Sequence, residues 1–343
     1  MKMAEASSSF AYGAVLAPPA RSHLHRSSFI VHRSSFIVSQ SLVVPRFPFM
    51  LFAFLTALLW SASSIASART AKMLGGPRAN AARLILATLL LGGWIGVSHG
   101  FSWSPQAWWF VVSGVIGLGL GDIALFSAYA RLGARLPALF THCLGVPLGA
   151  ALEWVWLGTP LHAGEAACIV VILAGVALAL TPDRHALRHD RAFLVGCGFG
   201  LMSACGLAVS AVLSRQGFSA ATAAGAPITG LDAALMRNLG GLGLCLLWVP
   251  LLSRTASAIP RPPLKVVLPW LGFTALVGPA IGVVCYQLAL AEMKVAVVQA
   301  VVALVPLLVI PLAWLIDGDR PRKRAWAGGA LGVAGVVGMA LLR

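Results

Sequence analysis

The sequence predicts an all-α membrane protein with ten transmembrane helices in two inverted five-helix repeats. The composition, the apolar runs and the placement of the basic residues lead to this prediction. Of the 343 residues, 59% are hydrophobic and 10% are charged, whereas an ordinary soluble domain has about 25% charged residues. A soluble protein of this size would lack the polar residues needed to cover its surface. The composition therefore excludes a soluble enzyme, a disordered chain and a secreted disulfide scaffold.

Residues 1–49 differ from the rest of the chain. The heptads 25–31 and 32–38 have the same sequence, HRSSFIV. The segment has no apolar run long enough to cross a membrane, and it lacks the apolar region and small-residue cleavage site of a signal peptide. Met50 stands directly before the first long apolar run. We expect residues 1–49 to be a disordered tail or to precede the true start at Met50.

Ten apolar runs follow, and they allow ten membrane helices of about 20 residues each. The runs cover residues 50–67, 81–97, 107–129, 136–157, 163–180, 192–213, 233–252, 266–289, 295–316 and 325–342. Glycine and other small residues are scattered through them, which suits close packing of helices in lipid.

Basic residues between the runs predict the orientation. Alternate loops, after the odd-numbered runs, hold 15 of them: Arg69, Lys72, Arg78, Arg131, Arg135, Arg184, Arg188, Arg191, Arg254, Arg261, Lys265, Arg320, Arg322, Lys323 and Arg324. The other loops and the carboxyl end hold only Arg215, Lys294 and Arg343. The positive-inside rule places the basic loops in the cytoplasm and both termini outside. Five basic residues before Met50 conflict with this, and a start at Met50 removes the conflict. The net charge of +15 is therefore a topology signal, and we expect no nucleic-acid partner.

The two halves of the chain repeat one plan. Pro147 and Pro306 lie near the middle of the fourth and ninth runs, 159 positions apart, and Arg135 and Lys294 precede them at the same spacing. An odd number of helices per repeat turns the second repeat upside down, as in many transporters. We place the first repeat at residues 50–180 and the second at 192–343. We expect the first, third, fourth, sixth, eighth and ninth helices to line a central cavity.

Several short motifs recur in order. The first half carries Leu59-Trp60-Ser61, Arg83, Leu120-Gly121-Asp122, Val146-Pro147, Leu157-Gly158 and Ala174-Gly175-Val176. The second half carries YQLAL at 286–290, Lys294, Leu304-Val305-Pro306, IDGDRP at 316–321 and Ala334-Gly335-Val336.

In this order and spacing, the motifs resemble the EamA repeat of the drug/metabolite transporter superfamily. The family pattern closes the fourth helix with Gly-Glu, where this chain has Gly158-Thr159, and the second repeat has the conservative variant Gly318-Asp319. With the inverted repeats, the resemblance implies a secondary-active exporter of a small polar metabolite, working by alternating access with or without proton coupling.

Ionisable residues inside the spans are functional candidates, because each costs about 2.5–3.5 kcal/mol on insertion scales. Asp122 is the most deeply placed carboxylate and is either a proton carrier or a packing group. His142 is either its proton partner or a satisfied packing histidine. Glu153, near the end of the fourth run, either reaches the interface or faces the cavity.

Neutral polar residues offer further candidates for binding the substrate. Trp60 and Ser64 make the first run unusually polar, and Tyr286, Gln287 and Gln299 supply hydrogen-bonding groups in the eighth and ninth runs. Such groups orient a polar ligand. Their alternative role is hydrogen bonding between helices or, for Trp60, anchoring at the interface.

Prolines and arginines in the spans have structural alternatives. Pro147 and Pro306 are helix-break candidates that free backbone carbonyls at mid-membrane, or they are simple packing kinks. Arg83 and Arg237 each begin the second helix of a repeat, and we expect topology anchoring for at least one of them.

Missing motifs restrict the function further. A Walker motif is absent, so ATP does not drive transport directly. The sequence also has no HExxH, no GxSxG and no paired carboxylates on a helix, which argues against an enzyme. All six cysteines lie in apolar runs without a CxxC pair, so we expect neither a metal site nor a disulfide. We also expect no cofactor.

Two alternatives to a metabolite exporter stay open. One is a flippase for a lipid-linked or amphipathic substrate, and the other is a non-catalytic structural membrane subunit. The expected partners are a small-molecule substrate, the lipid bilayer and, with coupling, protons. We expect a multi-pass monomer or homodimer in a bacterial inner membrane.

The orientation is testable with single cysteines in a background from which the native cysteines have been replaced. A cysteine at position 257 should react with an impermeant thiol reagent only from the cytoplasmic side, and one at position 104 only from the outside, because of the charge asymmetry of the loops. Labelling of position 257 in intact cells would contradict the orientation.

Overall fold

The structure, a computed structural model, describes residues 47–101, 103–180, 191–253, 262–317 and 323–342. The chain divides into two units, Met1–Val44 and Pro45–Arg343, and the first lies wholly outside the described residues. Outside them too lie Gly318-Asp319, Ser257 and six of the basic loop residues, namely Arg184, Arg188, Arg254, Arg261, Arg320 and Arg322.

Helices are the only regular elements in the described ranges, so the all-α prediction is confirmed. Most are uninterrupted: α1 (Phe47–Leu74), α2 (Gly76–Ser98), α5 (Arg135–Leu157), α6 (Ala163–Leu180), α7 (Arg191–Ala223), α8 (Gly230–Ser253) and α13 (Lys323–Leu341). Three further helical stretches consist of consecutive segments. The first contains the 3-10 turn η1 (Pro105–Ala107), α3 (Trp108–Gly114), the π-helix η2 (Val115–Gly121) and α4 (Asp122–Leu132). The second contains α9 (Leu264–Ala275), the π-helix η3 (Leu276–Ala280) and α10 (Ile281–Glu292), and the third contains α11 (Val295–Val302) and α12 (Val305–Asp317).

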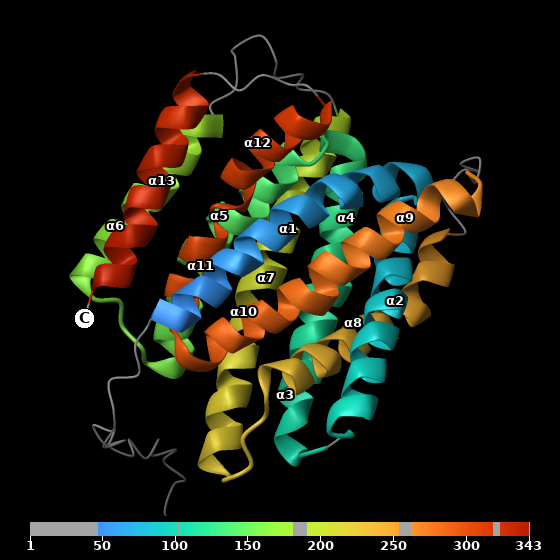
Figure 1. Cartoon of the computed structure of the whole chain (residues 1–343), viewed down its shortest axis with the longest axis horizontal. Coiled ribbons are helices and arrows are strands. Elements are labelled where there is room, and N and C mark those ends of the chain that lie inside the picture. Colours follow the sequence, from blue (N-terminus) through green and yellow to red (C-terminus); the bar gives the residue numbers. More distant parts are fainter. Residues whose placement is uncertain (1–46, 102, 181–190, 254–261, 318–322, 343) are drawn as a thin grey trace, which may run out of the picture. The chain divides into compact units, whose positions relative to one another are not determined.

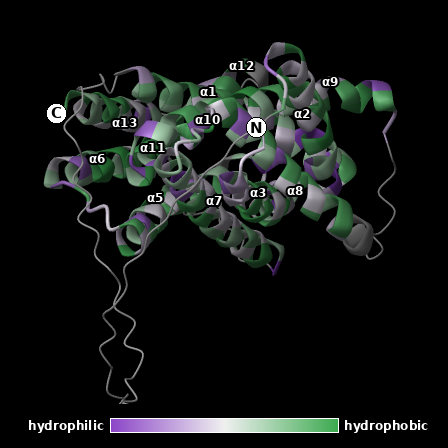
Figure 2. Ribbon diagram, turned by 90° about the horizontal axis from the view of Figure 1, so that it is seen from below, coloured by the Kyte–Doolittle hydropathy of each residue, from purple (hydrophilic) through white to green (hydrophobic). Residues whose placement is uncertain are grey.

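Length and composition make this chain a multi-pass membrane protein. Within the described residues, 8 helical stretches are long and apolar enough to cross a membrane. The α6 helix is apolar but shorter, and α8 is not among the eight. Apolar residues predominate along the helices (Figure 2), and large ones such as Leu89, Val97 and Leu247 are exposed on outer faces. Hydrocarbon can cover such faces, because helices satisfy their own backbone hydrogen bonds.

Helix α1 runs through the middle of the bundle, in contact with α10, α9, α12 and α4 (Figure 1). Helices α6 and α13 lie side by side at one edge. A Cβ atom on Gly175 of α6 would lie 2.6 Å from the carbonyl oxygen of Gly328 in α13. Only the absence of side chains lets these two backbones approach so closely, as is common between membrane helices.

Each half of the chain contains a π-helical segment braced by an asparagine. Asn80 of α2 donates from Nδ2 to the carbonyl oxygen of Leu118 in η2 at 2.9 Å, and Asn238 of α8 donates to that of Pro279 in η3 at 3.0 Å. A π-turn disturbs the regular hydrogen-bond ladder, and its carbonyls need partners inside the bundle. The two asparagines are 158 positions apart, close to the spacing of the paired prolines.

The paired prolines have different surroundings. Pro306 lies in the first turn of α12, directly after the interruption that separates α11 from α12. Pro147 lies within α5, which continues through it, and its side chain is exposed. Of the two, only Pro306 therefore lies next to an interrupted helix.

Glycines allow the close contact between α3 and α8 that positions Arg237. A Cβ atom on Gly114 would overlap the backbone carbonyl of Arg237. One on Gly240 would overlap the carbonyl of Val111. Neither contact can be relieved by a change of rotamer, because the opposing atoms belong to the backbone.

Gly114→Ala should lower the thermal stability of the purified protein in detergent. Overpacking of this kind costs about 1–3 kcal/mol. Gly96→Ala in α2 is the matched control, because nothing lies within 4 Å of its Cβ position. Alanine favours a helix over glycine by up to about 1 kcal/mol, so the control should be neutral or stabilising. Equal stability of the two variants would contradict the packing at Gly114.

Candidate functional site

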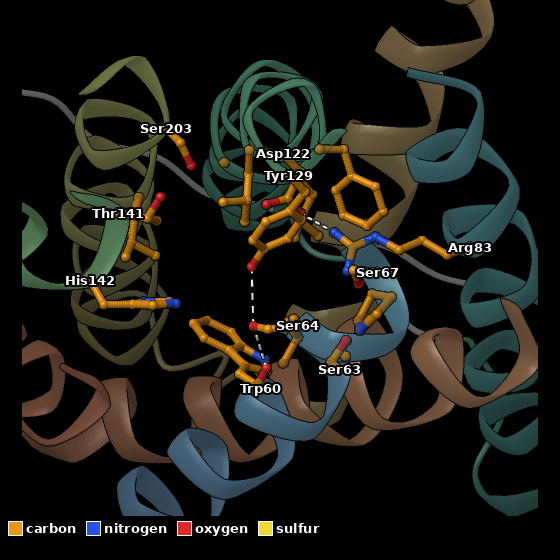
Figure 3. A pocket seen from close by; sticks show the side chains of 18 of the residues that line it. Trp60, Ser63, Ser64, Ser67, Arg83, Asp122, Tyr129, Thr141, His142 and Ser203 are labelled. Carbon is orange, nitrogen blue, oxygen red and sulfur yellow. Dashed lines mark hydrogen bonds and ion pairs between the residues drawn. The ribbon is translucent and has the colours of Figure 1, made fainter. Parts of the chain in front are cut away.

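A polar pocket lies inside the bundle (Figure 3). Its empty space is about 620 Å³, including the part at its open mouth. The lining residues come from α1, α2, η2, α4, α5, α7, α8, η3 and α10, so both halves of the chain build it.

The wall formed by α1 is rich in hydroxyl groups. Ser63 and Ser67 each hydrogen-bond the Thr274 hydroxyl of α9, at 2.9 and 2.7 Å. Ser64 accepts a hydrogen bond from the Tyr129 hydroxyl at 3.1 Å and donates to the carbonyl of Trp60 at 2.7 Å (Figure 3). These serines recur on one face of α1, which explains why this apolar run contains so many hydroxyls.

Trp60 forms an aromatic part of the same wall. Its ring centroid is 5.8 Å from that of His142 on α5 and 5.0 Å from that of Tyr286 on α10. The Trp60 and His142 rings point toward each other across the pocket (Figure 3). The pocket thus has a hydroxyl side and an aromatic side.

An ion pair crosses the pocket from α2 to the start of α4. Arg83 donates from Nη2 to Oδ2 of Asp122 and from Nε to the Asn80 amide oxygen at 3.0 Å. Its guanidinium also lies over the Phe126 ring, 4.5 Å from the centroid. Arg83 is only 6% exposed, so it does not anchor its helix at the interface.

Arg237 of α8 enters the pocket from the other half of the chain and is only 2% exposed. Its Nη1 donates to the hydroxyls of Ser113 and Ser214 at 2.8 and 2.7 Å. The expectation of topology anchoring is therefore wrong for this arginine too. Both arginines are buried because hydroxyl, amide or carboxylate partners surround them, and the apolar runs did not reveal those partners.

Comparison with known proteins decides the family. The sequence profile of the EamA-like transporter family matches residues 48–181 and 194–341. The chain belongs to this family. No curated protein matches the chain significantly.

A solved structure has a similar fold. It is described only as "Crystal structure of protein", shares 21% sequence identity with a TM-score of 0.66, and is matched over 86% of this chain and 97% of its own length. At this identity the likeness concerns the fold alone. EamA proteins are transporters and not enzymes, so this chain is a multi-pass transporter of the drug/metabolite superfamily.

In this EamA-like transporter, the helices around the pocket differ from those expected. The first, third, fourth, sixth and eighth helical stretches line it as predicted. Among the described residues, the ninth contributes none to the lining, whereas the second and seventh contribute Arg83 and Arg237. The second and seventh helices line the pocket because these arginines are long enough to reach it from helices that were not expected to line the cavity.

The predicted polar residues fall into two groups. Trp60, Ser64, Asp122 and His142 line the pocket. His142 is 4% exposed, and its Nδ1 has no hydrogen-bond partner among the described residues. Its hydrogen-bonding capacity is therefore unused within the described structure.

The second group lies behind the wall. Tyr286 and Gln287 are fully buried, and the Gln287 oxygen is 3.5 Å from Nη1 of Arg237. Gln299 of α11 faces α5, where a Cβ atom on Gly149 would overlap its amide group and one on Gly145 would lie 3.9 Å from its Oε1. Gln299 therefore fills a space that glycine leaves between two helices.

Glu153 neither reaches the interface nor lines the pocket. Its carboxylate accepts hydrogen bonds from the backbone N–H groups of Val295 and Ala296, at 3.0 and 3.2 Å. A carboxylate at this place accepts hydrogen bonds from the otherwise unpaired N–H groups at the start of α11, and its negative charge interacts favourably with the helix dipole. Next to it, Lys294 donates to Glu165 of α6 at 2.7 Å. Among the described residues, no three His, Cys, Asp or Glu side chains gather at a metal-binding distance.

The stability of the protein should depend on both charges of the Arg83–Asp122 pair being present together. Asp122→Asn leaves a buried guanidinium without its carboxylate, which costs about 3–5 kcal/mol when one partner is removed. The double variant Arg83→Gln/Asp122→Asn removes both charges and should regain most of that loss. Thermal unfolding in detergent measures both, with the exposed Glu292→Gln as the control. If Asp122→Asn is as stable as the unmodified protein, the ion pair does not contribute to stability as predicted.

Proposed function

We propose that the protein is a secondary-active transporter that carries a small polar metabolite out of the cell by alternating access. One observation supports this most strongly: the polar pocket is built by both halves of the chain, within helices whose outer faces are apolar. A site between two structural repeats can open to either side when one repeat moves against the other.

The proposed topology has ten spans in two inverted repeats, with α6 and α8 added to the eight apolar stretches. The two π-helical segments, each braced by an asparagine of the preceding helix, support a common plan. The basic residues of alternate loops support opposite orientations of the two repeats. We place the transporter in a bacterial inner membrane with both termini outside.

Asp122 is the proposed coupling site. In the pocket it is held by Arg83, and it can leave this pair at low cost only if it is protonated or if a substrate group replaces one partner. A proton that binds Asp122 would therefore release α4 from α2. This would couple proton movement to the opening of the pocket, with energy taken from the proton gradient.

The test is transport in proteoliposomes with an imposed pH gradient. A metabolite screen by ligand-induced stabilisation first supplies a radiolabelled substrate. The unmodified protein should accumulate it against its gradient. Asp122→Asn keeps the size of the side chain but cannot titrate, so it should lose uphill accumulation and keep exchange of substrate across the membrane.

Stability and coupling must be separated in this assay. The double variant Arg83→Gln/Asp122→Asn tests coupling with both charges of the ion pair removed, and Glu292→Gln controls for the loss of a carboxylate elsewhere. Uphill transport by Asp122→Asn would show that this carboxylate is not the coupling site. Absence of any flux of a bound metabolite in the unmodified protein would contradict the proposed function itself.

A further inference from the structure

Arg237 is a buried cation that no carboxylate of the described residues meets at ion-pair distance. Its Nη1 hydrogen bonds go to neutral oxygens, namely the hydroxyls of Ser113 and Ser214 and, at 3.5 Å, the Ser210 carbonyl and the Gln287 amide. In contrast, Arg83 has the carboxylate of Asp122. The two arginines of the pocket therefore differ in how their charges are compensated.

The remaining donors of Arg237 lie on one edge of its guanidinium. Nε is buried and has no hydrogen-bond partner in the described part of the chain. Nη2 lies 3.1 Å from the position of a Cβ atom on Gly117, a pocket residue without a side chain, and the Ser210 hydroxyl lies 2.6 Å from that position. The Nε and Nη2 groups of an arginine point in parallel, and this is the geometry that binds two carboxylate oxygens at once.

The charges around the pocket leave one positive charge unmatched. Of the lining residues, Arg83 and Asp122 form a pair, and Arg237 is the remaining side chain with a permanent charge. A buried charge without a counterion is costly. A ligand with a single negative charge would compensate Arg237, whereas a cation would add a second unmatched charge.

We propose that the substrate is a small organic monocarboxylate, whose carboxylate binds the Nε and Nη2 edge of Arg237. Its apolar part would lie along Leu118, Val283 and the ring of Trp60, which line the same pocket. This inference rests on the proposed transport function and names the chemical class of its substrate. A phosphate monoester, with up to two negative charges, fits a single guanidinium less well.

The first experiment compares four probes of similar shape: benzoate, benzamide, benzylamine and phenyl phosphate. The unfolding temperature of the full chain in detergent is measured against the concentration of each probe, at constant pH and ionic strength. Benzoate should raise the unfolding temperature in a saturable manner, because it binds the folded state. Benzamide and benzylamine should have no such effect, and phenyl phosphate a smaller one.

Three variants connect the effect to Arg237. Arg237→Gln should weaken benzoate binding about 30-fold or more, as expected when one partner of a buried charged pair is lost. Arg237→Lys keeps the charge without the planar edge and should bind benzoate with intermediate affinity. Arg131→Gln removes an exposed arginine outside the pocket and should leave benzoate binding unchanged.

Gln287→Glu tests the same inference without removing Arg237. Its new carboxylate would lie where the amide oxygen now lies, 3.5 Å from Nη1 of Arg237. An internal counterion should raise the unfolding temperature of the ligand-free protein and abolish the effect of benzoate. This variant also keeps the test decisive if Arg237→Gln does not fold.

Three outcomes would overturn the proposal: benzamide or benzylamine stabilising as well as benzoate, no benzoate effect at any concentration, or an undiminished benzoate effect in Gln287→Glu. Failure of the monocarboxylate assignment can be distinguished from failure of the proposed transport function. If the screen yields a cationic or neutral metabolite that proteoliposomes transport, the monocarboxylate assignment is wrong and the transporter remains. If benzoate binds at Arg237 but no ligand is transported, the site stands and the transport function does not.

Discussion

Inside a membrane, each buried polar group must find its partner within the protein, and this constraint determines much of the bundle. Water is absent from the hydrocarbon region, so an unpaired donor or acceptor costs several kcal/mol. The amide groups of Asn80 and Asn238 donate hydrogen bonds to carbonyls of the two π-helical segments. The Glu153 carboxylate accepts hydrogen bonds from the first N–H groups of α11. These contacts join helices far apart in the sequence and fix where they cross.

Three of the buried polar groups without a partner in the described structure belong to residues that line the pocket. Around it, Nδ1 of His142, the hydroxyl of Thr141 and Nε of Arg237 lack partners among the described residues. In a core that serves only packing, most such groups are satisfied or replaced with apolar side chains. The three groups belong to residues that line the same cavity, and this shared location, not the number of such groups, distinguishes the site from the rest of the bundle.

Periodicity and composition predicted the helices well, because a membrane span needs a long apolar run whatever its neighbours are. Even the polar face of α1 was visible in the run that holds Trp60 and Ser64. Pairings across the bundle were not visible, because they depend on which helices meet. At least one of Arg83 and Arg237 was expected at the interface, although a cation and Asp122 within apolar runs are typical of an ion pair. Glu153 likewise required the three-dimensional path of α11.

The contacts around the pocket also differ in strength, and this bears on how the proposed cycle can proceed. Helix α1 is joined to α9 and α4 through neutral hydroxyl pairs at Thr274 and Tyr129. In membrane proteins such hydrogen bonds average about 0.6 kcal/mol each. The pair between α2 and α4 involves two charges, and separating it leaves both uncompensated. In an alternating-access cycle, the hydroxyl pairs of α1 would therefore separate readily, whereas α2 and α4 would part only when Asp122 is protonated or a substrate group replaces one partner of the pair. The weak hydroxyl contacts would permit the helices to move, and the ion pair would allow this movement only after its charges have been compensated in another way.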